Sequence, residues 1–175
     1  MNITKGVALI VGLIISFSLF GQEVKWYTIE QAIELNKKEP RKIMVDVYTD
    51  WCGWCKKMDI GTFSNKIIAD YLNTTYYPVK FNAEQKEDVK IDTATFKYIA
   101  QGARGYHQLA ALLLNGEMSY PSVVFLNEKV QIFYINKGYK DAKQFDEILK
   151  FFGGNHHLDS TWDKWIAGYK SPIVN

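Results

Sequence analysis

The stretch KIMVDVYTDWCGWCKKM, residues 42–58, decides the fold of this 175-residue chain. Residues 42–48 form a β-rich apolar run, which predicts a buried strand that only the carboxylate of Asp46 interrupts. Cys52 and Cys55 follow directly, where the sequence becomes helical. The two residues between the cysteines allow both sulfurs to meet within disulfide distance at the first turn of that helix. Because a helix N-terminus supplies partial positive charge, the pattern indicates a reactive pair of thiols.

The two cysteines are expected to have different roles. Cys52, at the helix cap, is the predicted nucleophile with the more exposed sulfur, and Cys55 is the predicted resolving thiol. Haem attachment would need a histidine where the chain has Lys56. Structural zinc needs about four ligands, whereas the chain has only two cysteines, and its three histidines are distant in sequence. An inert structural disulfide stays open as an alternative, although a two-residue spacer at an exposed helix start favours redox chemistry.

Composition limits the classes of function further. Hydrophobic residues make up 47% of the chain, enough for a real core, so wholesale disorder is excluded. A formal net charge of +2, without any basic stripe, argues against nucleic acid as a partner. Two cysteines also cannot build the disulfide framework of a small secreted scaffold.

The first 21 residues have the pattern of a secretory signal peptide. Lys5 precedes an uninterrupted apolar or small stretch, residues 6–20, which is shorter than the roughly 20 residues of a membrane-spanning helix. We expect cleavage near Gly21 and a mature domain over residues 22–175. An uncleaved anchor is the alternative, because Leu19 fits a cleavage site poorly. In both cases the domain is expected to be exported, most simply to a periplasm.

Periodicity and caps predict the other elements. Thr28 and Gln31 form a capping box for a helix over residues 29–38. The further expected helices are one capped by Ser64 with Ile67, Ile68, Tyr71 and Leu72 inward, short ones over 94–100 and 106–115, and an amphipathic one over 142–152 with Phe145, Ile148, Leu149 and Phe152 inward. The further expected strands are 76–81, 122–126 and 130–135. The order predicts an α/β fold with a mixed central sheet flanked by helices, whose last two strands are antiparallel.

The motif and its surroundings resemble the thioredoxin superfamily. Residues 51–57, WCGWCKK after a strand, are similar to the motif of exported thioredoxin-like proteins, and residues 119–121, SYP before a strand, resemble the superfamily's cis-proline loop. Asp46 and Lys80 match its buried carboxylate and neighbouring lysine. A carboxylate in an apolar strand should have a raised pKa and could accept the proton of Cys55. Asp46 would instead face solvent if strand alternation turned it outward.

The resemblance implies a set of site residues. Those implied for catalysis are Cys52, Cys55, Asp46 and Lys80, and those implied for substrate binding are Trp51, Gly53, Trp54, Tyr120 and Pro121. A purely packing role for the two tryptophans is the alternative. No bound cofactor and no metal site is expected, and the histidines at 156 and 157 are expected to form a solvated loop pair.

The chain departs from the family in three places. Gly53 and Trp54 stand where thioredoxin has Gly-Pro, so a redox potential cannot be transferred. Between Lys80 and Pro121 lie 40 residues, where one short helix and two loops need only about 20. This predicts a helical insertion over about 83–117. A C-terminal helical extension over about 153–175 is also expected, with Trp162, Trp165, Ile166 and Tyr169 packed on the core.

These features together predict an exported, monomeric thiol–disulfide oxidoreductase, of reductase or isomerase type rather than an oxidase. Its partners would be cysteine-containing proteins, and a reductant outside the cytoplasm would need an electron donor at the membrane. The alternative is a thioredoxin-fold binding or chaperone module without redox turnover. The apolar residues 109–114 of the insertion could border the site and select substrates, or could only cover the sheet.

Overall fold

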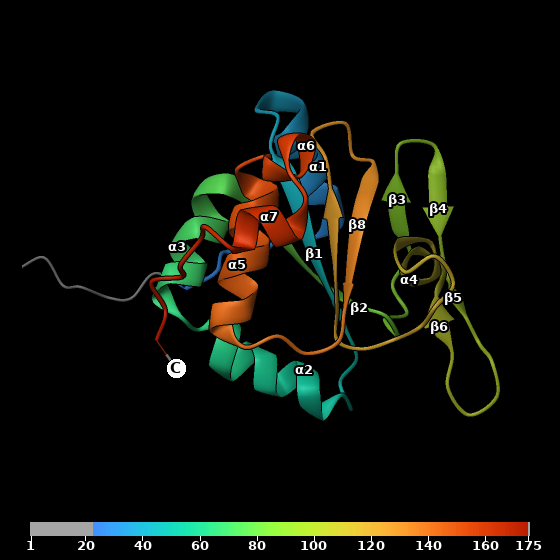
Figure 1. Ribbon diagram of the computed structural model, residues 1–175. Helices are drawn as coiled ribbons and strands as arrows, with labels where there is room; N and C mark the ends of the chain where they lie inside the picture. The colour runs from blue at the N-terminus through green and yellow to red at the C-terminus, as the bar shows by residue number, and fades with distance from the viewer. Residues whose placement is uncertain (1–22, 175) are drawn as a thin grey trace, which may run out of the picture.

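The computed structural model describes residues 23–174, so the predicted signal peptide lies outside the described residues. A four-stranded sheet in the order β2-β1-β7-β8 forms the centre of the molecule (Figure 1). Its strands are β1 (Lys42–Tyr48), β2 (Tyr76–Asn82), β7 (Ser122–Leu126) and β8 (Ile132–Lys137). β1 runs parallel to β2 and antiparallel to β7, which pairs antiparallel with β8. The predicted mixed sheet is therefore confirmed. Among the described residues, no helix has the length and apolar character needed to cross a bilayer.

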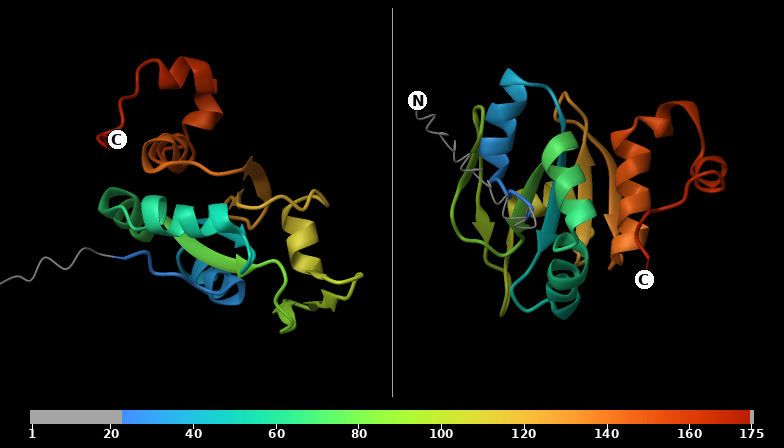
Figure 2. Two further views of the ribbon diagram at one scale, coloured as in Figure 1. Left: turned by 90° about the horizontal axis from the view of Figure 1, so that it is seen from below. Right: turned by 90° about the vertical axis from the view of Figure 1, so that its left-hand side faces the viewer.

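Helices cover both faces of the sheet, as the buried, apolar central strands require. α1 (Ile29–Lys38) lies on one face, and α3 (Lys66–Thr75) and α5 (Ala142–Gly153) lie on the other (Figure 2). α1 has the bounds and the capping box that the sequence predicts, since Thr28 and Gln31 exchange backbone-to-side-chain hydrogen bonds of 3.0 and 3.2 Å. Strand alternation puts Ile43, Val45 and Val47 on the α1 face and Met44 on the opposite face.

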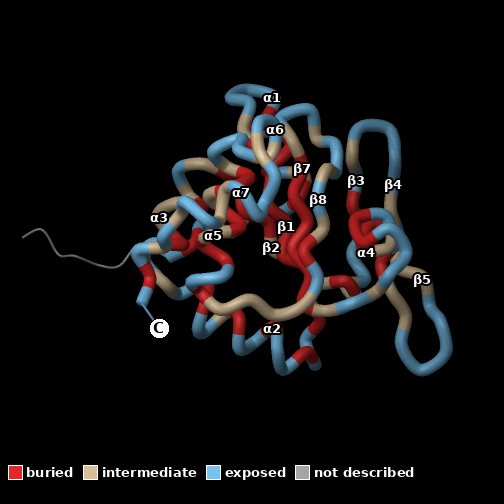
Figure 3. Tube along the Cα trace, in the orientation of Figure 1, coloured by how far each residue is buried: buried red, intermediate tan, exposed pale blue. Residues whose placement is uncertain are grey.

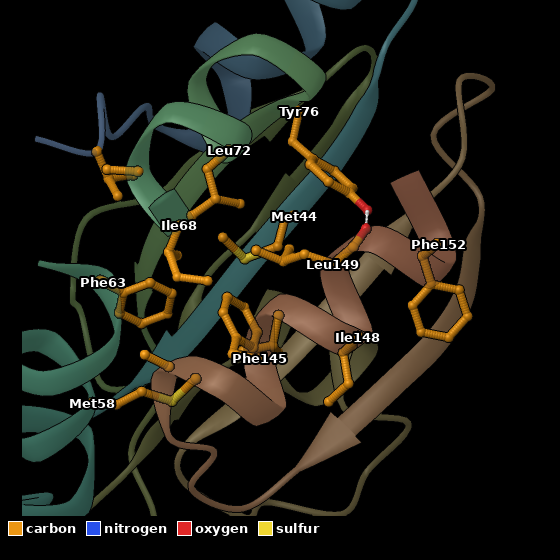
Figure 4. Close-up of a cluster of buried hydrophobic side chains, with 14 of the residues drawn as sticks. Met44, Met58, Phe63, Ile68, Leu72, Tyr76, Phe145, Ile148, Leu149 and Phe152 are labelled. Atoms are coloured by element: carbon orange, nitrogen blue, oxygen red, sulfur yellow. Dashed lines mark hydrogen bonds between the residues drawn. The ribbon is translucent and has the colours of Figure 1, made fainter. Parts of the chain in front are cut away.

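The core beneath α3 and α5 contains the inward residues predicted for α5 (Figure 4). The Tyr76 hydroxyl donates a 2.8 Å hydrogen bond to the Leu149 carbonyl and ties β2 to α5. The prediction for α3 is wrong in two details. Its N-cap is Asn65, whose side chain accepts from the Ile67 amide, and not Ser64. Ile67 is 37% exposed, whereas Ile68 and Leu72 are buried.

The insertion is mostly a pair of small hairpins and not the expected helical segment. It consists of β3 (Val89–Ile91), β4 (Ala94–Phe96), β5 (Tyr98–Ile99), β6 (Tyr106–His107) and α4 (Gln108–Leu113). The helix predicted over 94–100 is wrong because Asp92, at φ +50°, turns the chain so that β4 pairs with β3. α4 begins two residues later than predicted, since residues 106–107 pair with β5. Figure 3 shows that much of this lobe is exposed beside the buried sheet.

The predicted antiparallel pair of the last two strands forms as a hairpin, but its loop is longer than expected. β8 begins at Ile132 and not at residue 130, because Val130 adopts a φ of +60° in the turn. The Asn127 side chain accepts hydrogen bonds of 3.0 Å from the amides of Lys129 and Gln131 and holds that turn.

The C-terminal extension packs on the core, but as two short helices, α6 (His156–Asp159) and α7 (Trp162–Ile166). Trp162 and Trp165 place their ring centroids 5.3 and 5.4 Å from that of Phe151. The expectation of a solvated histidine loop is confirmed only for the exposure of His156. Both histidines lie in the short helix α6 and not in a loop, and the half-buried His157 stacks on Phe133 at 5.0 Å.

Candidate functional site

Cys52 and Cys55 form a disulfide at the start of α2 (Gly53–Met58). Cys52 is the N-cap, and its Sγ accepts a 3.1 Å hydrogen bond from the Cys55 amide. The two Cα atoms are 5.3 Å apart, as the two-residue spacer predicts. Cys52 is 5% exposed and Cys55 2%, so in this oxidised form both are buried and the expected difference in exposure is small. Figure 1 shows the chain leading from β1 into the start of α2 at the lower edge of the molecule.

Asp46 is buried beneath the sheet face that carries α2. It lies two residues after Met44 on β1 and therefore on the same face of the sheet, and it is 2% exposed, so the solvent-facing alternative is wrong. Its Oδ2 lies 2.8 Å from Lys80 Nζ, while Oδ1 has no hydrogen-bond partner among the described residues. Burial raises the pKa of Asp46 to about 6, and the charge of Lys80 opposes that shift. A carboxylate with such a pKa can both accept and release a proton near neutral pH.

Lys80 also forms an ion pair with Asp59, a residue that the sequence analysis did not identify. Asp59 begins η1 (Asp59–Phe63), a π-helical turn that continues α2. Lys80 Nζ additionally lies 5.0 to 5.3 Å from the ring centroids of Trp26, Tyr48 and Phe63. Burial lowers the pKa of Lys80, but the two carboxylates outweigh this effect and raise it overall. Lys80 therefore stays charged between two carboxylates.

A cleft of about 670 Å³ reaches this ion-pair network from the surface. Trp26, Asp59, Phe63 and Lys80 are among its lining residues. The Asp59 side chain is 41% exposed and that of Lys80 is 20% exposed, whereas Asp46 lies behind them. Lys80 and Asp59 therefore connect the buried carboxylate of Asp46 with solvent.

Aromatic side chains form the exposed rim beside the disulfide. Trp51 is 52% and Trp54 57% exposed, so core packing does not explain them. Trp51 Nε1 donates a 2.9 Å hydrogen bond to Glu84, and its ring meets that of Tyr120 edge-on at 6.1 Å. The Tyr120–Pro121 peptide bond is cis, as the resemblance implies. Burial raises the pKa of Tyr120 to about 12, so its hydroxyl stays protonated at neutral pH.

The rim also contains three residues that were not identified from the sequence, namely Lys57, Arg104 and Tyr139. The Arg104 guanidinium lies over the Trp51 ring, and Lys57 lies over the rings of Trp54 and Tyr139. Lys57 could have been identified from its place at the end of the motif at residues 51–57. Arg104 could not, because it lies in the insertion, whose strands the sequence pattern did not predict.

α4 itself covers the sheet. Leu109 and Leu113 are buried in the same cluster as Val47 and Val124, and His107 is fully buried. Within residues 23–174, no group of three or more His, Cys, Asp or Glu side chains is placed to hold a metal ion.

Comparison with known proteins agrees with this architecture. The chain is similar to a structure described as DsbH oxidoreductase, with 16% identity, a TM-score of 0.54 and coverage of 83% of this chain and 92% of that one. A thioredoxin from Thermus thermophilus is 18% identical, with a TM-score of 0.57 and coverage of 77% and 93%. A putative disulphide isomerase from Bacteroides thetaiotaomicron is 22% identical, with a TM-score of 0.54 and coverage of 81% and 98%. At these identities the likeness shows the thioredoxin fold.

Sequence comparison adds a distant relative and a family. Spermatogenesis-associated protein 20 of Rattus norvegicus is 30% identical over 84 residues, which are 47% of this chain and only 11% of that protein. The family model Thioredox_DsbH, described as a protein of unknown function, DUF255, matches residues 18–165. Since that match spans well over half of the sequence, and the fold and the Cys52–Cys55 pair agree with it, the chain belongs to the Thioredox_DsbH family of the thioredoxin superfamily.

Proposed function

We propose that this protein is an exported thiol–disulfide oxidoreductase that exchanges its Cys52–Cys55 disulfide with cysteines of protein substrates. The observation that carries the proposal is the placement of a disulfide at the start of α2 together with a buried, titratable Asp46–Lys80 pair on the sheet face that α2 covers. A disulfide that only braced the fold would not need a buried carboxylate whose pKa is near neutral.

In the reducing direction, the reaction begins with both cysteines as thiols. The Cys52 thiolate, stabilised by the amides at the start of α2, attacks one sulfur of a substrate disulfide. A disulfide forms between Cys52 and the substrate, and the other substrate sulfur leaves as a thiolate and takes a proton. This mixed disulfide is the intermediate of the exchange.

The second step releases the substrate. Cys55 transfers its thiol proton to the Asp46 carboxylate, and the resulting thiolate attacks the sulfur of Cys52. The Cys52–Cys55 disulfide forms, and the second substrate sulfur leaves as a thiolate, so two electrons have moved to the substrate. Lys80 stabilises the ionised form of Asp46 that must be ready to accept the proton.

The surface around the disulfide would hold the substrate chain. Trp51 and Trp54 offer an apolar rim, and Gly53 between them faces open space, so that a substrate backbone can approach the disulfide. The Tyr120 backbone, set by the cis bond to Pro121, would pair with an extended substrate segment.

We propose a reductase or isomerase direction, a monomeric state and export directed by residues 1–21. In an oxidising compartment the reduced form would have to be regenerated by an electron donor at the membrane.

Reduction of insulin by dithiothreitol tests the proposal. The wild-type protein should accelerate the precipitation of the insulin B chain, and Cys52→Ser should not. Serine is a favourable N-cap, so this variant removes the thiol while keeping the helix start. Equal rates with and without the wild-type protein would favour a binding or chaperone module.

A further inference from the structure

The rim around the disulfide carries two cations, Arg104 and Lys57, each lying over an aromatic ring. The guanidinium carbon of Arg104 lies 4.5 Å from the Trp51 ring centroid. Lys57 Nζ lies 4.8 Å from the Trp54 ring centroid and 5.1 Å from that of Tyr139. In the described part of the chain, neither cation forms a salt bridge. One unpaired cation therefore lies on each of the two exposed tryptophans beside Cys52.

Two carboxylates of the described residues also lie at this rim, but each binds a neutral side chain and neither forms a salt bridge with Arg104 or Lys57. Glu84 accepts the hydrogen bond of the Trp51 indole, at 2.9 Å. Asp50 accepts a 3.1 Å hydrogen bond from the Asn82 side chain. Arg104 and Lys57 lie over aromatic faces, which leaves their N–H groups able to bind an incoming anion.

The insertion holds Arg104 in place. Residues 100–105 connect β5 to β6, at the same lower end of the molecule as the start of α2 (Figure 1). Gly105 packs so closely on the Tyr98 ring and the Ile99 carbonyl that a Cβ could not fit there. The His107 amide then donates a 2.7 Å hydrogen bond to the Ala83 carbonyl, just beyond β2. The loop is thus fastened to the end of the central sheet.

Given the exchange activity proposed above, we propose that this rim selects protein segments with aspartate or glutamate beside the reactive cysteine. The cysteine of such a segment would meet Cys52 between the two tryptophans, and carboxylates on either side of it would meet Arg104 and Lys57. Charge complementarity of this kind speeds the association of acidic segments with the rim and slows that of basic segments. The insertion would then give this chain a substrate preference that the Cys52–Cys55 motif alone does not encode.

Matched peptide substrates test the preference. Three peptides of one length, each carrying a cysteine in a disulfide with a reporter thiol, would have Glu, Gln or Lys on both sides of that cysteine. The protein is first reduced and freed of reductant, and the rate constant for release of the reporter thiol is measured for each peptide. We expect the Glu peptide to react roughly five- to tenfold faster than the Lys peptide at low salt. The ratio should fall towards one at about 0.5 M salt, where the Debye length is only a few ångströms.

Charge reversal identifies the residue responsible. Arg104→Glu should reduce or invert the ratio of the Glu to the Lys peptide, whereas Lys90→Glu, the same charge change at an exposed position of β3 in the same lobe, should leave it as in the wild type. Because each ratio is taken within one variant, a general loss of activity cancels. Equal rates for all three peptides, or the same ratio in Arg104→Glu as in the wild type, would overturn the selection. No reaction with any peptide would instead contradict the exchange activity itself.

Discussion

Asp46 is buried, and this environment favours the protonated, neutral form of its carboxyl group. Because burial raises its pKa to about 6 from 3.8, the folded state binds a proton between about pH 4 and pH 6 that the unfolded chain has released. The contribution of this group to the free energy of unfolding is therefore fully present below about pH 4 and is lost as the pH rises through about 6. Asp46→Asn should be more stable than the wild type at pH 7, by up to about 3 kcal/mol.

Urea unfolding of the oxidised proteins at pH 4.5 and pH 7 measures this effect. The free energies of unfolding of the two proteins should lie closer together at pH 4.5 than at pH 7. An Asp46→Asn protein that is less stable than the wild type at pH 7, by the same margin as at pH 4.5, would mean that the ion pair with Lys80 outweighs the burial of Asp46.

Asp59 competes with Asp46 for Lys80. Asp59→Asn removes a negative charge that raises the pKa of Asp46 and leaves Lys80 to Asp46 alone, so both effects should lower that pKa. We expect the pH midpoint for resolution of a mixed disulfide by Cys55 to move below about 6. Asp70→Asn, whose carboxylate pairs with Lys66 on α3, is the control and should leave the midpoint in place. A midpoint that moves upward or stays fixed in Asp59→Asn would exclude this coupling.

The sequence predicted Asp46 but not Asp59, for a physical reason. Asp46 interrupts an apolar strand, so the pattern identified it and favoured its burial, and the structure excludes the solvent-facing alternative. Asp59 faces Lys80 because the helix widens there, with the Ser64 amide donating to the Asp59 carbonyl five residues earlier. A 3.6-residue period does not indicate where such a π-helical turn occurs.

At the level of single elements, His107 is a fully buried N-cap of α4. Its Nδ1 accepts from the Leu109 amide at 3.2 Å, so the ring proton is on Nε2, which faces the Glu87 carbonyl at 3.2 Å. His107→Ala should cost about 1–2 kcal/mol of unfolding free energy at pH 8. His107→Asn can still cap the helix and should lose less.

Burial lowers the pKa of His107, so its contribution is present above pH 6.5 and is lost as the pH falls through its folded-state value. The difference between wild type and His107→Ala should therefore shrink in acid, as urea titrations at several pH values would reveal. A difference that grows in acid would contradict the assigned tautomer.

Elements with strong patterns were predicted well, and short ones were not. α1 has a capping box and one apolar face, β1 is an apolar run interrupted only by Asp46, and both have the predicted bounds. The strands of the insertion are only two or three residues long, as in β3 and β6, and are defined by pairing with a neighbour. Such strands are too short to show any period, so residues 94–100 could not be distinguished from a helix.

At the scale of the whole molecule, the C-terminal extension completes the main core. Ile173 is 7% exposed and belongs to the cluster between the sheet, α3 and α5, whereas Leu158, in the same extension, is 71% exposed. Ile173→Ala should lower the free energy of unfolding by about 2–4 kcal/mol. Leu158→Ala should change it by less than about 0.5 kcal/mol. Equally small losses of unfolding free energy in both variants would mean that the core is complete without the C-terminal extension.

In the proposed reaction, Cys52 attacks disulfides of other proteins and Cys55 completes the exchange. The most direct measurement is mass spectrometry of the covalent adduct formed when reduced single-cysteine variants are mixed with oxidised insulin. Cys55→Ser should accumulate a disulfide between Cys52 and an insulin chain that dithiothreitol removes, because the resolving thiol is absent. Cys52→Ser should form little or none, because Cys55 lies inside the helix. An adduct that forms mainly through Cys55, or in neither variant, would contradict the roles proposed for the two cysteines.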